Sequence, residues 1–523
     1  MRVTAELSGR RLILALLLMA VLPALLAVAA VNYQRPDLPP GPPAYNPTPL
    51  NEPALLTALQ TRELQRSRRL SDEVVAAPVL VAPTFPEPLP TIVLAPRQQP
   101  YRLGELRQLL PSAFGQVGTA VLVRASLEVP MGSSLLIDVS DTPDVRLASS
   151  PTGFAAIISR GGRVDIAGTA DQPVRITSWD EGQQSYDTDP ADGRAFVLAF
   201  GARMDVARAD IGHLGFGNGT SSGVAWRGGP QTERDLDGPL AYGNVTSSVL
   251  HDNWFGASTS RAVGMKWRAN TFANNKAFGF DPHDMSNDFL VEDNVAFGNG
   301  RHGFRFARGA GANVVKNNEA FDNRGHGFLI ADGGAEVGAV GNGANGRGNL
   351  SASNDNQVVG NRAYDNDGSG IEVEGGTGNV VLDNVLERNH VGVRVKDGAT
   401  ATVAGNTIVD SRLFGVDVMA GAGDVSVSEN RVTGGWASIA LGKAAGARLT
   451  GNVLEDASTP LVVAGQAVRD DTITLAVARF FKWNPLLILW TAILGLPAVF
   501  GVTRLISYLL HRRGRSRVRP SLL

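Results

Sequence analysis

A short cluster of ionisable residues lies near the middle of the chain. Asp281, His283 and Asp284 come almost consecutively, and Arg305 and Arg308 follow one repeat later. Two carboxylates can orient an imidazole to accept a proton, because histidine titrates near neutral pH. A guanidinium can hold a carboxylate by forked hydrogen bonds, which lysine cannot form. These residue types favour proton abstraction from a substrate that itself carries a carboxylate.

The same residues also have simpler interpretations. The two arginines can form surface ion pairs with Asp281 and Asp284, and a histidine on a repetitive sheet is more often structural than catalytic. A divalent cation could bind Asp281, His283 and Asp284, but no regular ligand spacing supports such a site. We therefore predict neither a metal nor a cofactor.

A repeat in the second half of the chain predicts how these residues are positioned. An asparagine ends a strand-like run at Asn270, Asn294, Asn318, Asn361, Asn384, Asn406, Asn430 and Asn452, with gaps of 24, 24, 43, 23, 22, 24 and 22 residues. A period of this length, with several short strands per repeat, is typical of a right-handed parallel β-helix. The long gap contains a Gly- and Asn-rich segment, Gly333 to Asn356, which we interpret as an inserted loop. A leucine-rich repeat would require a regular leucine framework, which is missing.

Alternation along one strand of each coil separates core residues from outward ones. The predicted inward columns are Phe280, Phe304, Phe328, Ile371, Val393 and Val416, and Pro282, Phe306, Ile330, Val373, Val395 and Val418. The predicted outward columns are Asp281, Arg305, Leu329, Glu372, Arg394 and Asp417, and His283, Ala307, Ala331, Glu374, Lys396 and Met419. Adjacent coils lie about 4.8 Å apart. Asp281 should therefore lie over Arg305, and an exposed His283 beside the small Ala307.

Other polar residues extend this surface. Asp284 and Arg308 share the position where the strand turns, next to His283. His302 precedes the Gly-Phe step of its repeat, where it either forms a structural turn ladder with the next repeat or contacts the substrate. Arg394 and Lys396 face outwards further along and could extend an anion-binding groove.

Composition limits the classes of function. The formal net charge of -2 argues against binding nucleic acid through its phosphates, and the absence of cysteine excludes disulfides and thiolate chemistry. Leu12 to Val31 is uncharged and follows three arginines, so it is either a signal anchor or a cleaved signal peptide. A second apolar run begins at Pro485, and five arginines follow it. The positive-inside rule then places both termini in the cytoplasm and the β-helix body outside the cell membrane.

The sequence thus predicts an all-β protein, a right-handed parallel β-helix flanked by N- and C-terminal transmembrane helices. The expected parts are a signal anchor or signal peptide at 1–31, a Pro-rich arm with a helix at 32–100, the β-helix at 101–470, a transmembrane helix at 485–510 and a basic cytoplasmic tail at 511–523.

Several pieces of the chain resemble one known family. The matching segments are IGHLGFGNGTSSGVAW (211–226), FGFDPHD (278–284), HGFRFAR (302–308), RAYDNDGSGI (362–371) and ERNHVGVRV (387–395). The stretch from about 211 to 406 resembles the periplasmic mannuronan C5-epimerases of alginate synthesis, which are right-handed β-helix enzymes. DPHD followed by HG-x4-R is the specific part of the match. The resemblance implies that His283 is the catalytic base, that Arg308 neutralises the substrate carboxylate and that Asp281 supports them.

The expected function is therefore a membrane-anchored polyuronate C5-epimerase. By position, Asp284, His302, Arg305, Arg394 and Lys396 are candidate substrate-binding residues. A lyase with the same site, or a non-catalytic carbohydrate-binding or accessory β-helix, remains an alternative. The expected partners are an anionic polysaccharide, the membrane and a polysaccharide synthesis or export complex, with no nucleic acid.

Overall fold

The computed structural model describes most of the chain between residues 54 and 463. The described residues are 54–72, 74–83, 89–217, 219–229, 238–332, 352–442, 447–457, 459–463 and 504. The predicted membrane span 12–31, the span 485–510 except residue 504, and most of the predicted loop from Gly333 lie outside these residues. Within the described ranges, no helix is both long and apolar enough to cross a membrane.

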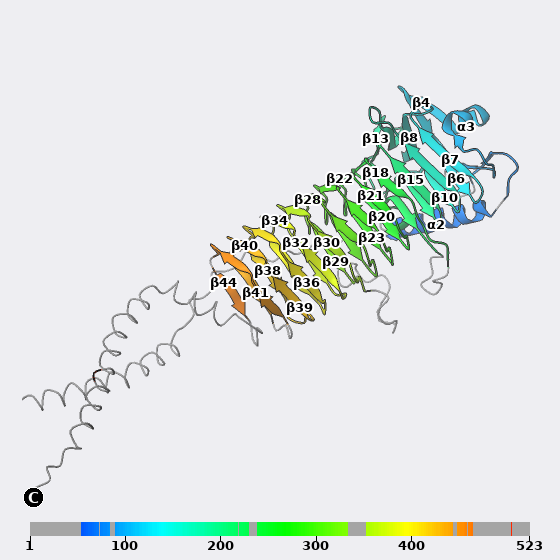
Figure 1. Cartoon of the computed structure of the whole chain (residues 1–523). Helices are drawn as coiled ribbons and strands as arrows, with labels where there is room; N and C mark the ends of the chain where they lie inside the picture. The colour runs from blue at the N-terminus through cyan, green and yellow to red at the C-terminus, as the bar shows by residue number, and fades with distance from the viewer. Residues whose placement is uncertain are drawn as a thin grey trace, which may run out of the picture. The chain divides into compact units, whose positions relative to one another are not determined.

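The described body is a solenoid in which each coil contributes a strand to three parallel sheets (Figure 1). In the described part, sheet A has 15 strands from β1 (Val79–Val81) to β44 (Thr459–Val463), sheet B has 13 and sheet C has 16. The strands of sheet A around the ionisable cluster are β17 (Gly223–Arg227), β20 (Phe255–Ser260), β23 (Phe280–His283), β26 (Phe304–Ala307), β29 (Phe328–Ala331), β32 (Ser369–Glu374), β35 (Val391–Lys396) and β38 (Phe414–Val418). The predicted parallel β-helix is confirmed.

Strand register in sheet A is the one that the predicted inward and outward columns require. Phe280 pairs with Phe304, which pairs with Phe328, and all three side chains are buried. Phe304 and Phe328 stack with ring centroids 4.9 Å apart and planes 5° apart. Parallel in-register pairing therefore repeats identical side chains along the axis, which creates the aromatic column of the core.

The predicted asparagines form a continuous buried ladder. From Asn270 to Asn452, each Nδ2 donates to the Oδ1 of the asparagine in the next coil at 2.8 to 3.1 Å. Two further ladders, which the sequence analysis did not identify, run from Asn275 to Asn389 and from Asn313 to Asn379. Because Asn356 belongs to the latter, the inserted loop ends before it.

Asn318→Ala should lower stability markedly, because the side chain serves several buried groups. Its Nδ2 donates to Val291 O at 2.9 Å, and its Oδ1 accepts from the backbone N–H of Asn294 at 2.9 Å. Each buried polar group that loses its hydrogen-bond partner lowers the free energy of unfolding by about 1–3 kcal/mol. We therefore expect a clear drop in melting temperature, measured by circular dichroism. Asn317→Asp, at the exposed neighbouring position, is the matched control. Equal melting temperatures for both variants would contradict a structural role of the ladder.

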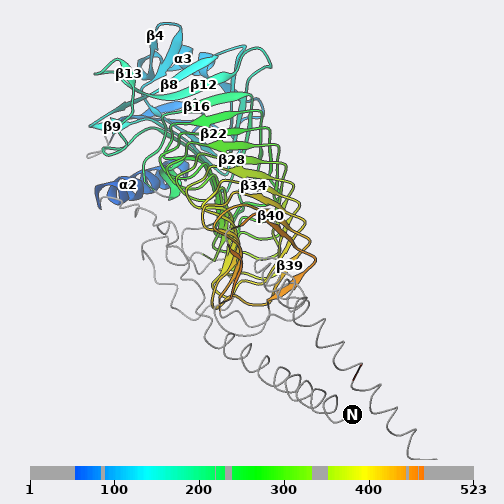
Figure 2. The ribbon, with the colours of Figure 1, turned by 90° about the vertical axis from the view of Figure 1, so that its left-hand side faces the viewer.

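The N-terminal arm contributes structure of its own. Helix α2 (Ala54–Ser71), within the segment predicted to be helical, packs against sheet A at β6 (Ser126–Pro130) and β10 (Ala156–Arg160). Arg66 Nη2 donates to Ser126 Oγ at 2.7 Å there. Figure 2 shows α2 beside the stacked coils. Strand β2 (Thr91–Val93) already pairs with β6, so sheet A begins inside the predicted Pro-rich arm rather than at residue 101.

Candidate active site

His283 ends strand β23 and faces outwards from sheet A. Its partners in neighbouring strands are Ser260 on one side and Ala307 on the other, as the alignment predicts for the second. The imidazole is not exposed as the sequence predicts, because the residue is only 7% exposed. The carboxylates of Asp281 and Asp284 lie against its two ring nitrogens and cover part of the ring.

Both ring nitrogens of His283 face carboxylates. Nδ1 lies 3.1 Å from Asp281 Oδ2 and 3.2 Å from the Asp281 carbonyl oxygen, whereas Nε2 lies 3.4 Å from Asp284 Oδ2. Two acceptors at Nδ1 favour the tautomer that carries its proton there, which leaves the Nε2 lone pair available. Nε2 is then the ring nitrogen that can exchange a proton with a substrate, next to the Asp284 carboxylate.

Asp281 is held ionised beneath the imidazole. It is 1% exposed, and Arg305 Nη1 donates to its Oδ1 at 2.7 Å. Burial alone would raise the pKa of Asp281, but the charges of Arg305 and His283 outweigh it and lower that pKa to about 2. Arg305 is itself 4% exposed and lies over the Phe278 ring at 4.9 Å. We therefore assign Arg305 to supporting Asp281, and its predicted contact with substrate is not favoured.

Asp284 and Arg308 occupy the turn after the strands, as predicted. Their backbone φ values of 49° and 55° place both in the left-handed region, where the chain leaves sheet A. Arg308 Nε donates to Asp284 Oδ1 at 2.8 Å, and the Arg308 side chain is 41% exposed. Burial opposes ionisation of Asp284, but His283 and Arg308 lower its pKa. Arg308 thus offers an accessible positive charge beside the imidazole.

Arg227 is a site residue that the sequence analysis missed. It ends β17 and pairs with Ser260, which in turn pairs with His283, so it belongs to the same outward column. Burial lowers its pKa, against the raising effect of the Asp284 charge. No carboxylate among the described residues forms an ion pair with Arg227. Its position in the HLGFGNGTSSGVAWR segment was the only sequence signal available.

His302, by contrast, belongs to the structural turn ladder. It is 0% exposed, and its Nδ1 accepts the backbone N–H of His326 at 2.9 Å. The two rings stack with centroids 4.7 Å apart, and Phe278 stacks on the other side of His302 at 5.4 Å. A ring enclosed in this way cannot reach a polymer, so the structure contradicts the predicted substrate contact of His302.

Arg394 and Lys396 face outwards as predicted, but their charges are already balanced. Arg394 Nε donates to Asp417 at 2.9 Å. Lys396 Nζ lies 3.0 Å from Glu372 and 3.4 Å from Glu374. This surface is a mixed-charge network rather than the simple cationic extension that the sequence predicted, because adjacent coils place opposite charges in register.

Two sequence families match parts of the chain. The family described as "Right handed beta helix region" matches residues 231–344, and the one described as "Periplasmic copper-binding protein (NosD)" matches residues 334–474. The first agrees with the observed fold.

Curated relatives confirm the resemblance that the motifs indicated. The chain is 26% identical to the mannuronan C5-epimerase of Pseudomonas fluorescens over 191 residues, which cover 35% of this chain and 34% of that protein. It is 25% identical to the mannuronan C5-epimerase of Pseudomonas aeruginosa over 213 residues, covering 39% and 38%. The chain therefore matches only about a third to two-fifths of the length of these relatives.

A solved structure confirms the architecture. The crystal structure of the periplasmic alginate epimerase AlgG superposes with a TM-score of 0.56 at 19% identity, covering 72% of this chain and 86% of that one. At this identity the likeness establishes the fold, a parallel β-helix, independently of the short motifs.

Proposed function

We propose that this protein is a polyuronate C5-epimerase that acts on a mannuronan-like chain. The observation that supports it most directly is the imidazole of His283, held by Asp281 at Nδ1 and placed beside the accessible guanidinium of Arg308. The sequence likeness to mannuronan C5-epimerases agrees with it.

The proposed reaction begins by breaking the C5–H bond of a uronate residue. The electron pair left on C5 delocalises into the adjacent carboxylate, whose added negative charge Arg308 offsets. His283 Nε2 takes the proton as general base, and the ionised Asp281 stabilises the resulting imidazolium. A proton delivered to the opposite face of C5 by solvent inverts the configuration, and His283 then returns its proton to solvent.

The test monitors the hydrogen at C5 of the uronate residues directly. The purified full chain is incubated with mannuronan in deuterated water, and the polymer is examined by proton NMR. Epimerisation predicts guluronate signals with deuterium at C5. Unchanged polymer would count against the proposal for this substrate.

A lyase is the closest alternative, since the same carbanion can expel the 4-linked sugar. It predicts unsaturated chain ends, visible by ultraviolet absorbance in the same reaction. An accessory role without catalysis is supported by the match of residues 334–474 to the copper-binding NosD family. It predicts no change in the polymer at all, and full function of a His283 variant.

Arg227 is expected to bind a carboxylate of the polymer next to the reacting residue. It shares the column of His283, and no described carboxylate pairs with it, whereas Arg308 is paired with Asp284. A charged hydrogen bond contributes about 1.5–3 kcal/mol, so Arg227→Gln should raise KM about tenfold or more with a smaller change in kcat. Initial rates across polymer concentrations measure both constants.

The control for Arg227 is Arg203→Gln, because Arg203 lies in sheet B and pairs with Asp205 on its own strand. It should leave both constants unchanged. A fall in kcat alone for the Arg227 variant would instead place this guanidinium at the reacting carboxylate.

Membrane attachment is part of the proposal and is supported by sequence alone. The two apolar runs and the arginines that flank them favour anchoring in the cell membrane, with the body extracytoplasmic and near a polysaccharide synthesis or export complex. Washing isolated membranes at alkaline pH should leave the chain in the pellet. Quantitative release into the supernatant would contradict anchoring.

A further inference from the structure

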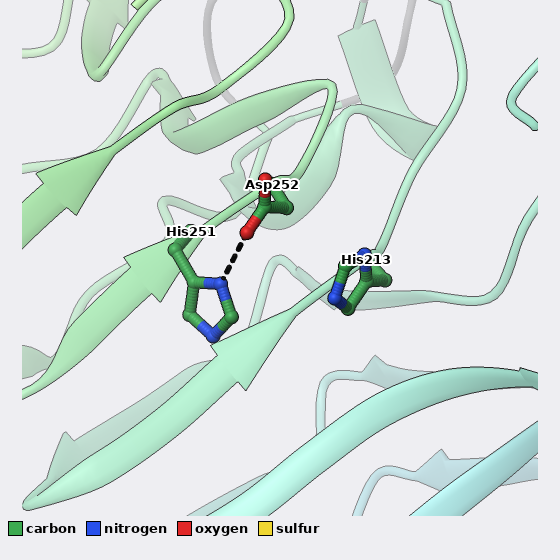
Figure 3. A group of neighbouring side chains, drawn as sticks. All are labelled: His213, His251 and Asp252. Carbon is green, nitrogen blue, oxygen red and sulfur yellow. Dashed lines mark hydrogen bonds and ion pairs between the residues drawn. The ribbon is translucent and has the colours of Figure 1, made fainter. Parts of the chain in front are cut away.

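Two neighbouring turns of sheet C bring a second group of histidines and carboxylates together. Strand β16 (Ala209–Gly212) is followed by His213, and strand β19 (Val249–His251) is followed by Asp252. Gly212 pairs with His251, so His213 and Asp252 occupy the same turn position in successive coils. Figure 3 shows the three side chains, with Asp252 pointing at the ring of His251 and His213 standing to one side of them.

The geometry of this group brings three potential ligand atoms close together. One ligand atom each from His213, His251 and Asp252 lies within 4.8 Å of the other two. The imidazole planes cross at 81° with centroids 5.7 Å apart. A side chain at Gly212 would clash, since a Cβ there would lie 2.6 Å from His251 Cε1. The glycine therefore leaves the space that the His251 ring occupies.

A carboxylate outside the group orients His251. Asp210 Oδ1 lies 2.9 Å from His251 Nε2, and Asp252 Oδ2 lies 2.7 Å from Nδ1. A histidine that ligates a metal usually gives its other ring N–H to a carboxylate, which fixes the tautomer. Asp210 is placed to accept from Nε2 in this way, so that Nδ1 faces His213 and Asp252.

An ion-pair network alone does not explain why a histidine occupies position 213. Its ring stacks on Tyr186 at 4.8 Å with planes 8° apart, and among the described residues no hydrogen bond to its nitrogens is found. Its backbone φ of 60° lies in the left-handed region, which His tolerates together with Asn and Asp. An imidazole held here by stacking, beside a carboxylate and a second imidazole, is arranged as a ligand would be.

We propose that His213, His251 through Nδ1 and Asp252 bind one divalent transition-metal ion of the zinc type. Two imidazoles and one carboxylate suit zinc, nickel or copper, whereas calcium and magnesium prefer oxygen ligands only. The site lies on sheet C, outside residues 334–474 of the copper-binding family match, and it takes no part in the proposed epimerisation. The bound ion would cross-link successive turns and stabilise this part of the solenoid.

The competing interpretation is a metal-free ion pair. Hydrogen bonds to Asp210 and Asp252 raise the pKa of His251 to about 9, so a metal must displace the proton at Nδ1. The nearby guanidinium of Arg194 adds positive charge, but it donates to the carbonyls of Gly215 and Leu214. The experiment below separates the two interpretations.

The test uses the purified full chain, stripped with a chelator and titrated with zinc chloride by calorimetry. We expect one zinc ion per chain and a higher melting temperature, with calcium chloride giving neither. Cobalt chloride should give visible absorption bands that added zinc abolishes, a readout that needs no variant. Absence of zinc binding and of cobalt bands would overturn the proposal.

Variants then assign the ligands. Asp252→Asn and His213→Ala should each weaken zinc binding by at least about tenfold, and Asp210→Asn by about 10- to 100-fold. Asp322→Asn is the matched control, because Asp322 occupies the same left-handed turn position in a later coil and is exposed. Circular dichroism checks the fold of each variant. Zinc binding that survives unchanged in folded His213→Ala and Asp252→Asn would place the ion elsewhere and refute the site.

Discussion

His283→Gln should reduce kcat on mannuronan by about 10²- to 10⁴-fold, the contribution of a positioned general base. Glutamine keeps a polar side chain between the two carboxylates but has no lone pair basic enough to take the C5 proton. Deuterium incorporation at C5, followed by proton NMR, measures the loss. Because Asp281 remains paired with Arg305 at 2.7 Å, the fold around the site should persist.

Met419→Ala provides the matched control for His283. Met419 directly follows β38, several coils away, at the position that the repeat aligns with His283, and is 39% exposed. Its removal should leave both kcat and KM unchanged. A His283→Gln protein that retains wild-type exchange at C5 would contradict the assignment of this imidazole as the base, while leaving the fold assignment intact.

Arg308→Asn should lower kcat by about 10²- to 10³-fold, because one preorganised charge at a developing oxyanion contributes this much. Asparagine tolerates the φ of 55° at this turn, so the substitution removes the charge without straining the backbone. Stability should fall modestly, because Arg308 is 41% exposed but its partner Asp284 is mostly buried and loses one of the charges that keep it ionised. Initial rates and melting temperatures together separate the two effects.

The corresponding control is Arg388→Asn. Arg388 also occupies a left-handed turn position, with φ of 52°, and pairs with Asp365 at 2.6 Å on a half-exposed surface of sheet C. Its loss should affect neither rate nor melting temperature. If Arg308→Asn behaves like this control, Arg227 becomes the guanidinium that offsets the substrate carboxylate.

Much of the architecture follows from sequence alone, because it depends on local and repetitive rules. The recurring asparagines determine the coil length, and alternation along each strand determines which residues are core. These two rules predict that Phe280 lies over Phe304 in the next coil and that Asp281 meets Arg305, and the structure has both the strand pairing and the ion pair. Because parallel strands pair in register, the neighbours of a residue in adjacent coils can be predicted from the sequence repeat alone.

Contacts that depend on side-chain conformation could not be derived in this way. Sequence position cannot show that His283 is nearly enclosed, that His302 accepts a backbone N–H, or that Lys396 is neutralised by Glu372. Each depends on rotamers and on which neighbour reaches which atom. The outward columns were therefore placed correctly, while the roles of several members were not.

In the coils before residue 270, the backbone register also could not be predicted from the sequence repeat. The pairing of β17 with β20 shifts between Gly223 and Ala225, which interrupts the period that aligns the later repeats. Across that irregularity no motif connects Arg227 to the column of His283. The repeat by itself determined the fold and the centre of the site. Only the tertiary structure decided which residues from the irregular coils join them, because a bulge changes register without leaving a periodic signal in the sequence.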